Sequence, residues 1–471
     1  MKIPNQLHID QTGCPDEFMF RQFRRHSRVL RTPARFDYFM LSGGANLFPM
    51  SSVWKELLQL EISSDMAYGW YTSQEGFPTL QRAVSMWENY AASKGMFPAE
   101  KPLGSHVCIT LGATQAVAAI FDYIAHNFTH KSVLLVGLNY PLFERLARHY
   151  AFKIYELLND DRELSSTLPT AAQVTSFIRA TRPTIVVLVT PNNPSGEQYS
   201  EEDLAHILRE AAKIETLVLL DQVGQMLIAQ DSWINIGEVI VQTDTQEQAI
   251  VVNSFSKSDG VPGFRIGYLL GPKRVALHAA RYQLITTMNP PTVPVIPPFF
   301  SLLVRCAHVG DQLAWLKRTN RSSLLSFARH MFEVTTAIAP PDVLEEMNQR
   351  LSCKGFEKDY MRYCHFQEEI GRAIRQNHAY VFDRLGMYIS HATDLQGGFN
   401  FLVELEPFSG KDEDEICKQL FDKTAVAILT ESCFRVSPRR RKNFWIRMSL
   451  AAPQDKFVSA VDKLAKFVTS I

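Results

Sequence analysis

Four short runs of almost wholly apolar residues recur along the middle of the chain, at residues 132–136, 184–189, 217–220 and 249–252. Strands that are buried on both faces of a parallel sheet show such continuous apolar runs, whereas half-exposed strands alternate. Segments with helical spacing lie between the runs. The pattern therefore predicts an α/β fold in which a mostly parallel sheet carries helices on both faces.

The run at 249–252 leads into a loop that contains Ser254, Ser256, Lys257 and Arg265. A buried lysine is costly, so its presence at the end of a buried strand needs a chemical reason. Desolvation and neighbouring cations free a lysine amine to attack a carbonyl group. Hydroxyl groups and a guanidinium fork are suited to hold a phosphate. An amine beside a phosphate cradle predicts a site for pyridoxal 5'-phosphate (PLP).

The sequence of this loop, SFSK followed by G..GFRIGY, closely resembles the cofactor-lysine segment of the class I and II aminotransferases, which are PLP-dependent enzymes of fold type I. The resemblance implies that Lys257 is the Schiff-base lysine and that Ser254 and Arg265 bind the cofactor phosphate. It also implies a seven-stranded, mostly parallel sheet with helices on both faces, plus a smaller α/β domain.

Two further segments carry the resemblance. Residues 190–196, TPNNPSG, resemble the family's NPxNPTG signature, which implies that Asn193 contacts the ring oxygen of the cofactor and the substrate. Residues 444–450, FWIRMSL, form an apolar strand with one charge, Arg447. An arginine inside such a strand requires an anionic partner. The family resemblance implies that this partner is the α-carboxylate of the substrate.

Other strand ends supply the remaining candidate cofactor ligands. Asp221 ends the run 217–220, where the resemblance implies pairing with the pyridine nitrogen, although a helix-capping aspartate is the alternative. Ala113 and Thr114 open a helix after a strand, which is the usual anion-binding arrangement, and the family resemblance assigns them to the phosphate. Tyr140 corresponds to an aromatic residue that stacks on the ring, or is a packing residue.

Two candidates near the N-terminus depend on weaker matches. Tyr71 lies in a segment similar to the family's Tyr-x4-Gly-x-Pro-x-Leu, where the tyrosine reaches the neighbouring subunit's cofactor phosphate. The alternative is a core or interface aromatic. Gly44 follows an apolar segment and Gly43, and the resemblance implies a backbone contact with the substrate. A plain turn is the alternative reading.

The sequence departs from the family pattern at two places. Gly224 stands three residues after Asp221, where the family usually has a tyrosine bonded to the cofactor. Residues 310–360 are longer than the family needs and have helical spacing, which suggests a helical lid, a dimer element or an enlarged small domain. The expected domains are an N-terminal arm with part of the small domain (1–64), a large PLP-binding domain (65–308) and a small C-terminal domain (309–471).

Charge and cysteine content narrow the possible partners. The 49 basic and 49 acidic residues balance, which predicts neither a nucleic-acid partner nor a membrane partner. No run of residues is apolar enough for a signal peptide or a bilayer span. The seven cysteines are scattered, with no spacing typical of a metal site, so the sequence predicts no metal and a reduced, cytoplasmic protein.

The sequence predicts a homodimeric aminotransferase with shared active sites, acting on an amino acid and a 2-oxo acid. The first alternative is a biosynthetic PLP enzyme that catalyses elimination, replacement, cyclisation or oxidation, which Gly224 and the 310–360 segment favour. The second is a regulatory domain without catalysis, although only about 38 residues precede the matching region.

Overall fold

The computed structural model describes residues 41–63, 71–93, 103–159, 166–229, 233–312, 319–335, 339–437 and 443–471. Of the predicted N-terminal segment 1–64, residues 1–40 and 64 lie outside these ranges, and so does the predicted boundary between residues 64 and 65. Within the described residues, no helix has the length and apolar character needed to cross a membrane.

Seven strands form one sheet in the order β1-β7-β6-β5-β4-β2-β3. Strand β7 runs antiparallel to both of its neighbours, and the other six strands run parallel to one another. The predicted mostly parallel, seven-stranded sheet is thereby confirmed. The strands are β1 (His106–Leu111), β2 (Ser132–Val136), β3 (Lys153–Leu157), β4 (Ile185–Val189), β5 (Leu217–Asp221), β6 (Ala249–Ser254) and β7 (Ile266–Gly271).

Helices cover both faces of this sheet because successive residues of its central strands point to opposite sides. In β4, Ile185 and Val187 belong to one apolar cluster, whereas Val186 and Leu188 belong to another. Full burial of such side chains stabilises the fold by about 1.5–3 kcal/mol each. One face carries α4 (Gly112–Asn127), α5 (Leu142–His149) and α10 (Lys273–Thr286), and the other carries α6 (Ala171–Thr181), α7 (Glu201–Ala212) and α8 (Ile236–Thr243).

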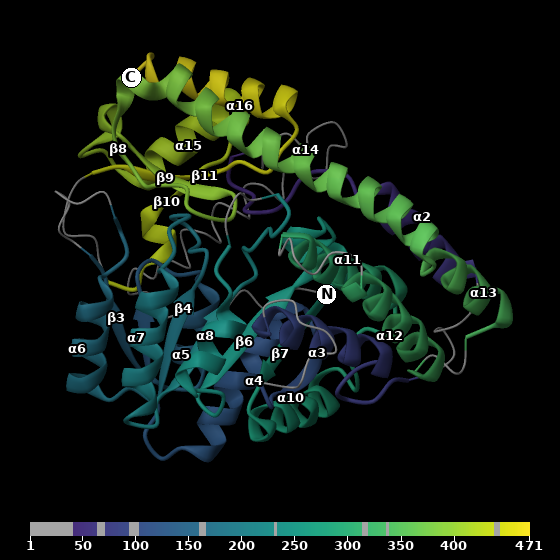
Figure 1. Cartoon of the computed structure of the whole chain (residues 1–471). Coiled ribbons are helices and arrows are strands. Elements are labelled where there is room, and N and C mark those ends of the chain that lie inside the picture. Colours follow the sequence, from purple (N-terminus) through teal and green to yellow (C-terminus); the bar gives the residue numbers. More distant parts are fainter. Residues whose placement is uncertain are drawn as a thin grey trace, which may run out of the picture.

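A second, smaller sheet lies beyond the carboxyl ends of the large one (Figure 1). Its four strands are antiparallel in the order β10-β11-β9-β8. The segment that begins at Leu41 joins this part of the molecule, because Ser449 N donates to Leu41 O at 3.0 Å and Leu47 N to Ala451 O at 2.8 Å. The elements are β8 (Ile389–Ala392), β9 (Asn400–Leu405), α15 (Glu413–Thr424), β10 (Leu429–Thr430), β11 (Trp445–Ser449) and α16 (Gln454–Val468).

The long helix α14 (Cys353–Leu385) connects the two parts, as its course across the molecule in Figure 1 shows. Its first half packs in an apolar cluster with α2, α3, α11, α12 and α13, and its second half packs on the small sheet. The bounds of these helices are α2 (Ser52–Ser63), α3 (Pro78–Ala92), α11 (Ile296–Gln312), α12 (Thr319–Thr335) and α13 (Pro341–Arg350).

The predicted domain boundary between residues 308 and 309 falls inside α11. The described helices of the 310–360 segment, α12 and α13, share their apolar cluster with α2 and α3 rather than with the small sheet. Since a boundary is expected where few contacts cross, we propose that the large domain includes these helices and that α14 is the connection.

The segment after Lys257 is held by buried polar groups. Lys257 lies in the short helix α9 (Phe255–Ser258), and Asp259 follows it with a fully buried side chain. Arg305 of α11 pairs with Asp259 at 2.9 Å, and Tyr363 of α14 donates to the same carboxylate at 2.5 Å. A buried charge keeps its place only when paired and hydrogen-bonded, so these contacts tie the lysine segment to α11 and α14.

Candidate active site

A cavity of about 270 Å³ opens between the two sheets, at the carboxyl ends of the parallel strands. This edge of an open α/β sheet is where ligands ordinarily bind, since the strands there end in loops. Among the sequence-predicted site residues, ten line this cavity: Gly44, Ala113, Thr114, Tyr140, Asn193, Asp221, Ser254, Lys257, Arg265 and Arg447.

Tyr71 is the predicted residue that does not line the cavity. Its side chain is 82% exposed, in the extended segment before α3. The predicted role concerns the cofactor of a neighbouring subunit, so it stays a prediction.

The amine of Lys257 projects into the cavity from the end of β6. Its Nζ donates to the carbonyl oxygen of Gly44 at 2.5 Å, and its own carbonyl accepts from Asn46 Nδ2 at 3.1 Å. Burial, followed by the cations of Arg447 and Arg265, lowers the pKa of Lys257 from its ordinary 10.5 to about 8, although the charge of Asp221 acts to raise it. A substantial fraction of the amine is therefore neutral, and so nucleophilic, slightly above neutral pH.

Asp221 ends β5, beside β6 and close enough to Lys257 for the two charges to affect each other. Burial raises the pKa of its carboxyl group from 3.8 to about 6, although the hydrogen bond from Val223 N at 2.9 Å and the charge of Lys257 act to lower it. A buried carboxylate of this kind is stabilised by a cation placed next to it. A protonated pyridine nitrogen would be such a cation.

An anion cradle forms where β1 meets α4. The first amides of a helix have no intrahelical carbonyl to bond, and the helix dipole favours negative charge there. Arg265 lies across this point, with Nη2 3.4 Å from Thr114 Oγ1. Gly112 is required, because its φ is +69° and a Cβ there would lie 2.7 Å from Arg265 Nη2. The Ser254 hydroxyl lines the same cavity.

Arg447 is a buried cation with neutral partners. Its Nη1 donates to Asn193 Oδ1 at 2.9 Å and its Nη2 to Ser42 O at 2.5 Å, while the guanidinium lies 5.0 Å from the centre of the Phe434 ring. Burial lowers its pKa to about 10. Among the described residues, no acidic side chain pairs with Arg447, and its Nε has no hydrogen-bond partner. A carboxylate from a ligand would supply the missing charge.

Gly44 allows the approach of both cationic side chains. A Cβ at this position would lie 2.7 Å from Arg447 Nη2, and the residue has a φ of +52°. Any side chain here would therefore displace the guanidinium. In this structure the backbone at Gly44 lies against Lys257 and Arg447, and the predicted contact between Gly44 and a substrate stays a prediction.

The residues present fit PLP. Among the described residues that line the cavity, the cations are Lys257, Arg265 and Arg447, and the acid is Asp221. This excess of positive charge suits a ligand pair with a phosphate and a carboxylate. The hydroxyl groups, the helix amides and the buried acid match the phosphate, the ring hydroxyl and the ring nitrogen of the cofactor in chemical type.

Some contributors to the site carried no sequence signal. Phe434 lies under Arg447, and Ser42 accepts from it, yet neither belongs to a motif with fixed spacing. Gly224 lines the cavity, and a Cβ at this position would lie 3.3 Å from Pro191 O. The turn after β5 therefore packs tightly on the turn after β4, which gives the departure at Gly224 a packing reason.

The lowered pKa of Lys257 can be tested on the cofactor-free protein. Competitive acetylation across pH 6–11, read by peptide mass spectrometry, should show half-maximal reactivity of Lys257 near pH 8, because only the neutral amine reacts. Arg447→Ala removes a cation and should move this midpoint upward, whereas Asp221→Asn removes an anion and should move it downward. A midpoint for Lys257 near its ordinary 10.5 would contradict the prediction.

The known proteins that resemble this chain include aminotransferases. The family model for aminotransferase class I and II matches residues 37–296. The probable N-acetyl-LL-diaminopimelate aminotransferase of Bacillus subtilis is 30% identical over 210 residues, 44% of this chain and 49% of that protein. The aspartate aminotransferase of Streptomyces avermitilis is 27% identical over 231 residues, 49% of this chain and 53% of that protein. The chain thus spans about half the length of these curated relatives.

Solved structures share the fold. The crystal structure of the aspartate aminotransferase from Rhizobium meliloti superimposes with a TM-score of 0.68 at 18% identity, over 99% of both chains. At this level of identity the likeness establishes the architecture, and the chemistry must be argued from the residues in the cavity.

Proposed function

The chain belongs to the class I and II aminotransferase family, and on that premise we propose that it is a PLP-dependent aminotransferase acting on an amino acid and a 2-oxo acid. The observation that carries the proposal is the shared cavity of Lys257, Asp221 and Arg447. These three supply an amine with a lowered pKa, an acid and a buried cation that lacks an acidic partner.

The cofactor-binding role of each residue follows from its chemistry. We propose that the cofactor phosphate is bound by Ser254, Arg265 and the backbone amides of Ala113 and Thr114 at the start of α4. Asn193 is assigned to the ring hydroxyl. Tyr140, at the mouth of the cavity, provides an aromatic face for stacking. Bound PLP would supply an electron sink that stabilises negative charge at the α-carbon of the substrate.

The chain's own groups would then handle the substrate and the proton. Arg447 grips the α-carboxylate through its planar fork, because its partners Asn193 and Ser42 hold the guanidinium in place. Lys257, which anchors the cofactor, becomes the base at the α-carbon, since its pKa of about 8 lies close to neutral pH. Asp221 would stabilise a protonated ring nitrogen of the bound cofactor.

The half-reaction tests this function. PLP-loaded protein should lose its near-visible absorbance band on addition of a suitable amino acid, form one equivalent of the matching 2-oxo acid per site, and regain the band when another 2-oxo acid is added. The first compounds to test as amino donors are aspartate and N-acetyl-LL-diaminopimelate, because the names of the two similar proteins contain them. Free ammonia released together with an oxo acid, while the band persists, would favour elimination, and an unchanged band without any product would contradict catalysis.

We also propose a homodimer in which Tyr71 reaches the partner's site. Several large apolar side chains are exposed around the segment before α3 and the end of α10: Tyr71, Leu111, Leu284, Ile285 and Met288. The two segments are adjacent, because Gln283 Nε2 donates to Gln74 O at 2.6 Å and Ile109 N donates to Glu75 O at 2.8 Å. Exposed apolar patches mark interaction sites. Sedimentation of a fully active monomer at micromolar concentration would exclude this arrangement.

A cytoplasmic location is part of the same proposal. The six cysteines that the structure describes are free thiols, and most of them are buried. Free thiols of this number are usual in a reducing compartment.

A further inference from the structure

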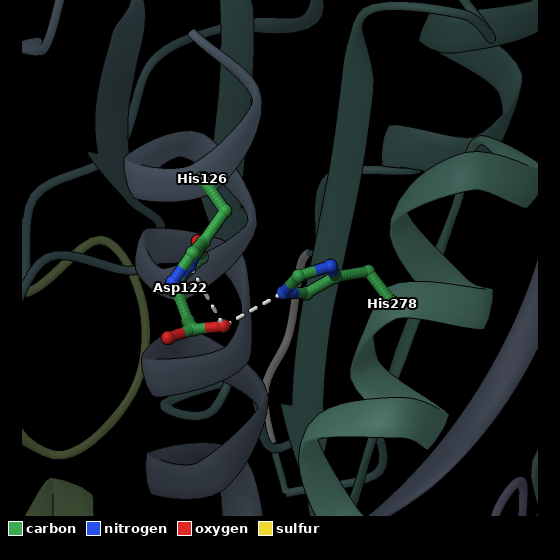
Figure 2. Close-up of side chains that lie close together, drawn as sticks. All are labelled: Asp122, His126 and His278. Atoms are coloured by element: carbon green, nitrogen blue, oxygen red, sulfur yellow. Dashed lines mark hydrogen bonds and ion pairs between the residues drawn. The ribbon is translucent and has the colours of Figure 1, made fainter.

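Three side chains that commonly bind metal ions converge at the end of α4 that lies away from the phosphate cradle. Asp122 and His126 are four residues apart on α4, and His278 comes from α10. Figure 2 shows the imidazole of each histidine directed toward the carboxylate of Asp122. Within the described part of the chain, one ligand atom from each residue lies within 4.8 Å of the others.

The three ligand atoms are close enough to share one ion after small movements. His278 Nε2 lies 2.8 Å and His126 Nδ1 lies 3.4 Å from Asp122 Oδ2. Two ligand atoms that each lie about 2.0–2.2 Å from a tetrahedral zinc ion are separated by about 3.4 Å. His126 Nδ1 also lies 2.8 Å from the backbone carbonyl oxygen of Asp122, so binding of an ion would exchange that contact for a bond to the metal. Each imidazole would then carry its remaining proton on the other nitrogen.

The carboxylate is already oriented for this role. The second oxygen of Asp122 accepts a hydrogen bond from the hydroxyl of Tyr150 at 3.0 Å. That contact leaves Oδ2 directed at the two histidines. Outer-shell hydrogen bonds orient carboxylate ligands in the same way at metal sites. The side chains of Asp122 and His278 are 16% and 18% exposed, whereas that of His126 is 65% exposed. Water can therefore reach the site and complete the coordination.

We propose that Asp122, His126 and His278 form a binding site for a divalent transition-metal ion such as Zn²⁺. Two imidazoles and one carboxylate are the donors that such ions accept. The ion would cross-link α4 and α10. The same two helices are joined nearer the cofactor cradle, where Gln115 of α4 donates to Thr287, just beyond α10, at 3.0 Å. The metal ion would be a second connection between these helices, and it would stabilise the folded protein without taking part in the reaction.

Calorimetric titration of tag-free, PLP-loaded protein with ZnCl₂ tests the proposal. The expected result is saturable binding of one ion per chain, with a rise in the unfolding temperature when Zn²⁺ is present. His278→Gln and His126→Gln should each weaken this binding by at least about 10-fold and abolish the temperature shift. Absorption of bound Co²⁺ in the visible range would report nitrogen and oxygen ligands independently.

The matched control is His365→Gln. His365 forms an exposed pair with Glu369 on α14, also four residues apart, but has no third ligand there. This variant should bind Zn²⁺ like the parent. Absence of saturable binding, or binding that survives both His126→Gln and His278→Gln, would overturn the proposal. The cofactor absorbance of each variant shows that it has folded, so a failure of the metal site is separable from a failure of the proposed function.

Discussion

Replacement of Lys257 by alanine should abolish turnover and remove the near-visible absorbance of the PLP-loaded protein. The reason is that Lys257 is the amine with a lowered pKa in the cavity and has two tasks, as covalent anchor of the cofactor and as base. General acid–base assistance alone contributes about 10²–10⁴-fold, and loss of the anchor adds to this effect, so we expect the rate to fall by about 10⁴-fold or more.

The measurement compares spectra and steady-state rates with those of Lys354→Ala, which truncates an exposed lysine on α14. That control should retain both the band and the activity. The assignment would be refuted by a Lys257→Ala protein that keeps the band and has a rate within 10-fold of the parent rate. A tenfold difference in rate corresponds to about 1.4 kcal/mol of activation free energy.

Replacement of Arg447 by alanine should lower kcat/KM for amino acids by about 10²–10³-fold, while the cofactor band persists. Truncating one partner of a buried, hydrogen-bonded charge pair costs about 2–5 kcal/mol, and the substrate carboxylate would form such a pair with Arg447. Arg447→Lys should recover part of the loss, since it keeps the charge but lacks the fork that Asn193 and Ser42 now hold.

Amines without a carboxylate provide the discriminating measurement. If Arg447 binds the carboxylate, its removal should reduce the rate with an amino acid and leave the slower rate with the corresponding simple amine nearly unchanged. Arg384→Gln, which disrupts an exposed pair with Asp462, controls for general loss of positive charge. Equal loss with both substrates would assign Arg447 to the framework of the site instead.

Local sequence was enough to find most of this site because the relevant signals are short. A buried strand followed by a turn of small and polar residues is recognisable within a dozen positions, as at Lys257 and Asn193. The continuous apolar run of β4 likewise predicts a strand with helices on both faces, and the sheet confirms it. The charge of Arg447 in an apolar strand signals an anionic partner.

Residues without such a motif could not be found from the sequence. Phe434 lies under Arg447, and Tyr363 donates to Asp259 from a helix 104 positions further along the chain. Neither spacing nor composition marks these contacts. They exist because α14 and the small sheet pack against the large domain, and packing depends on how whole elements fit together.

The sequence by itself determined the strands, the lysine loop and the chemical type of the side chains proposed to bind the cofactor, since backbone conformation and residue chemistry are local properties. Only the tertiary structure decided that Gly44 meets Lys257 across 213 positions and that His278 meets Asp122 across 156. The physical reason is packing between whole elements: the segment of Gly44 joins the small sheet, and α4 and α10 share one apolar cluster on a face of the large sheet. The proposed metal site therefore has no trace in the linear spacing of the histidines.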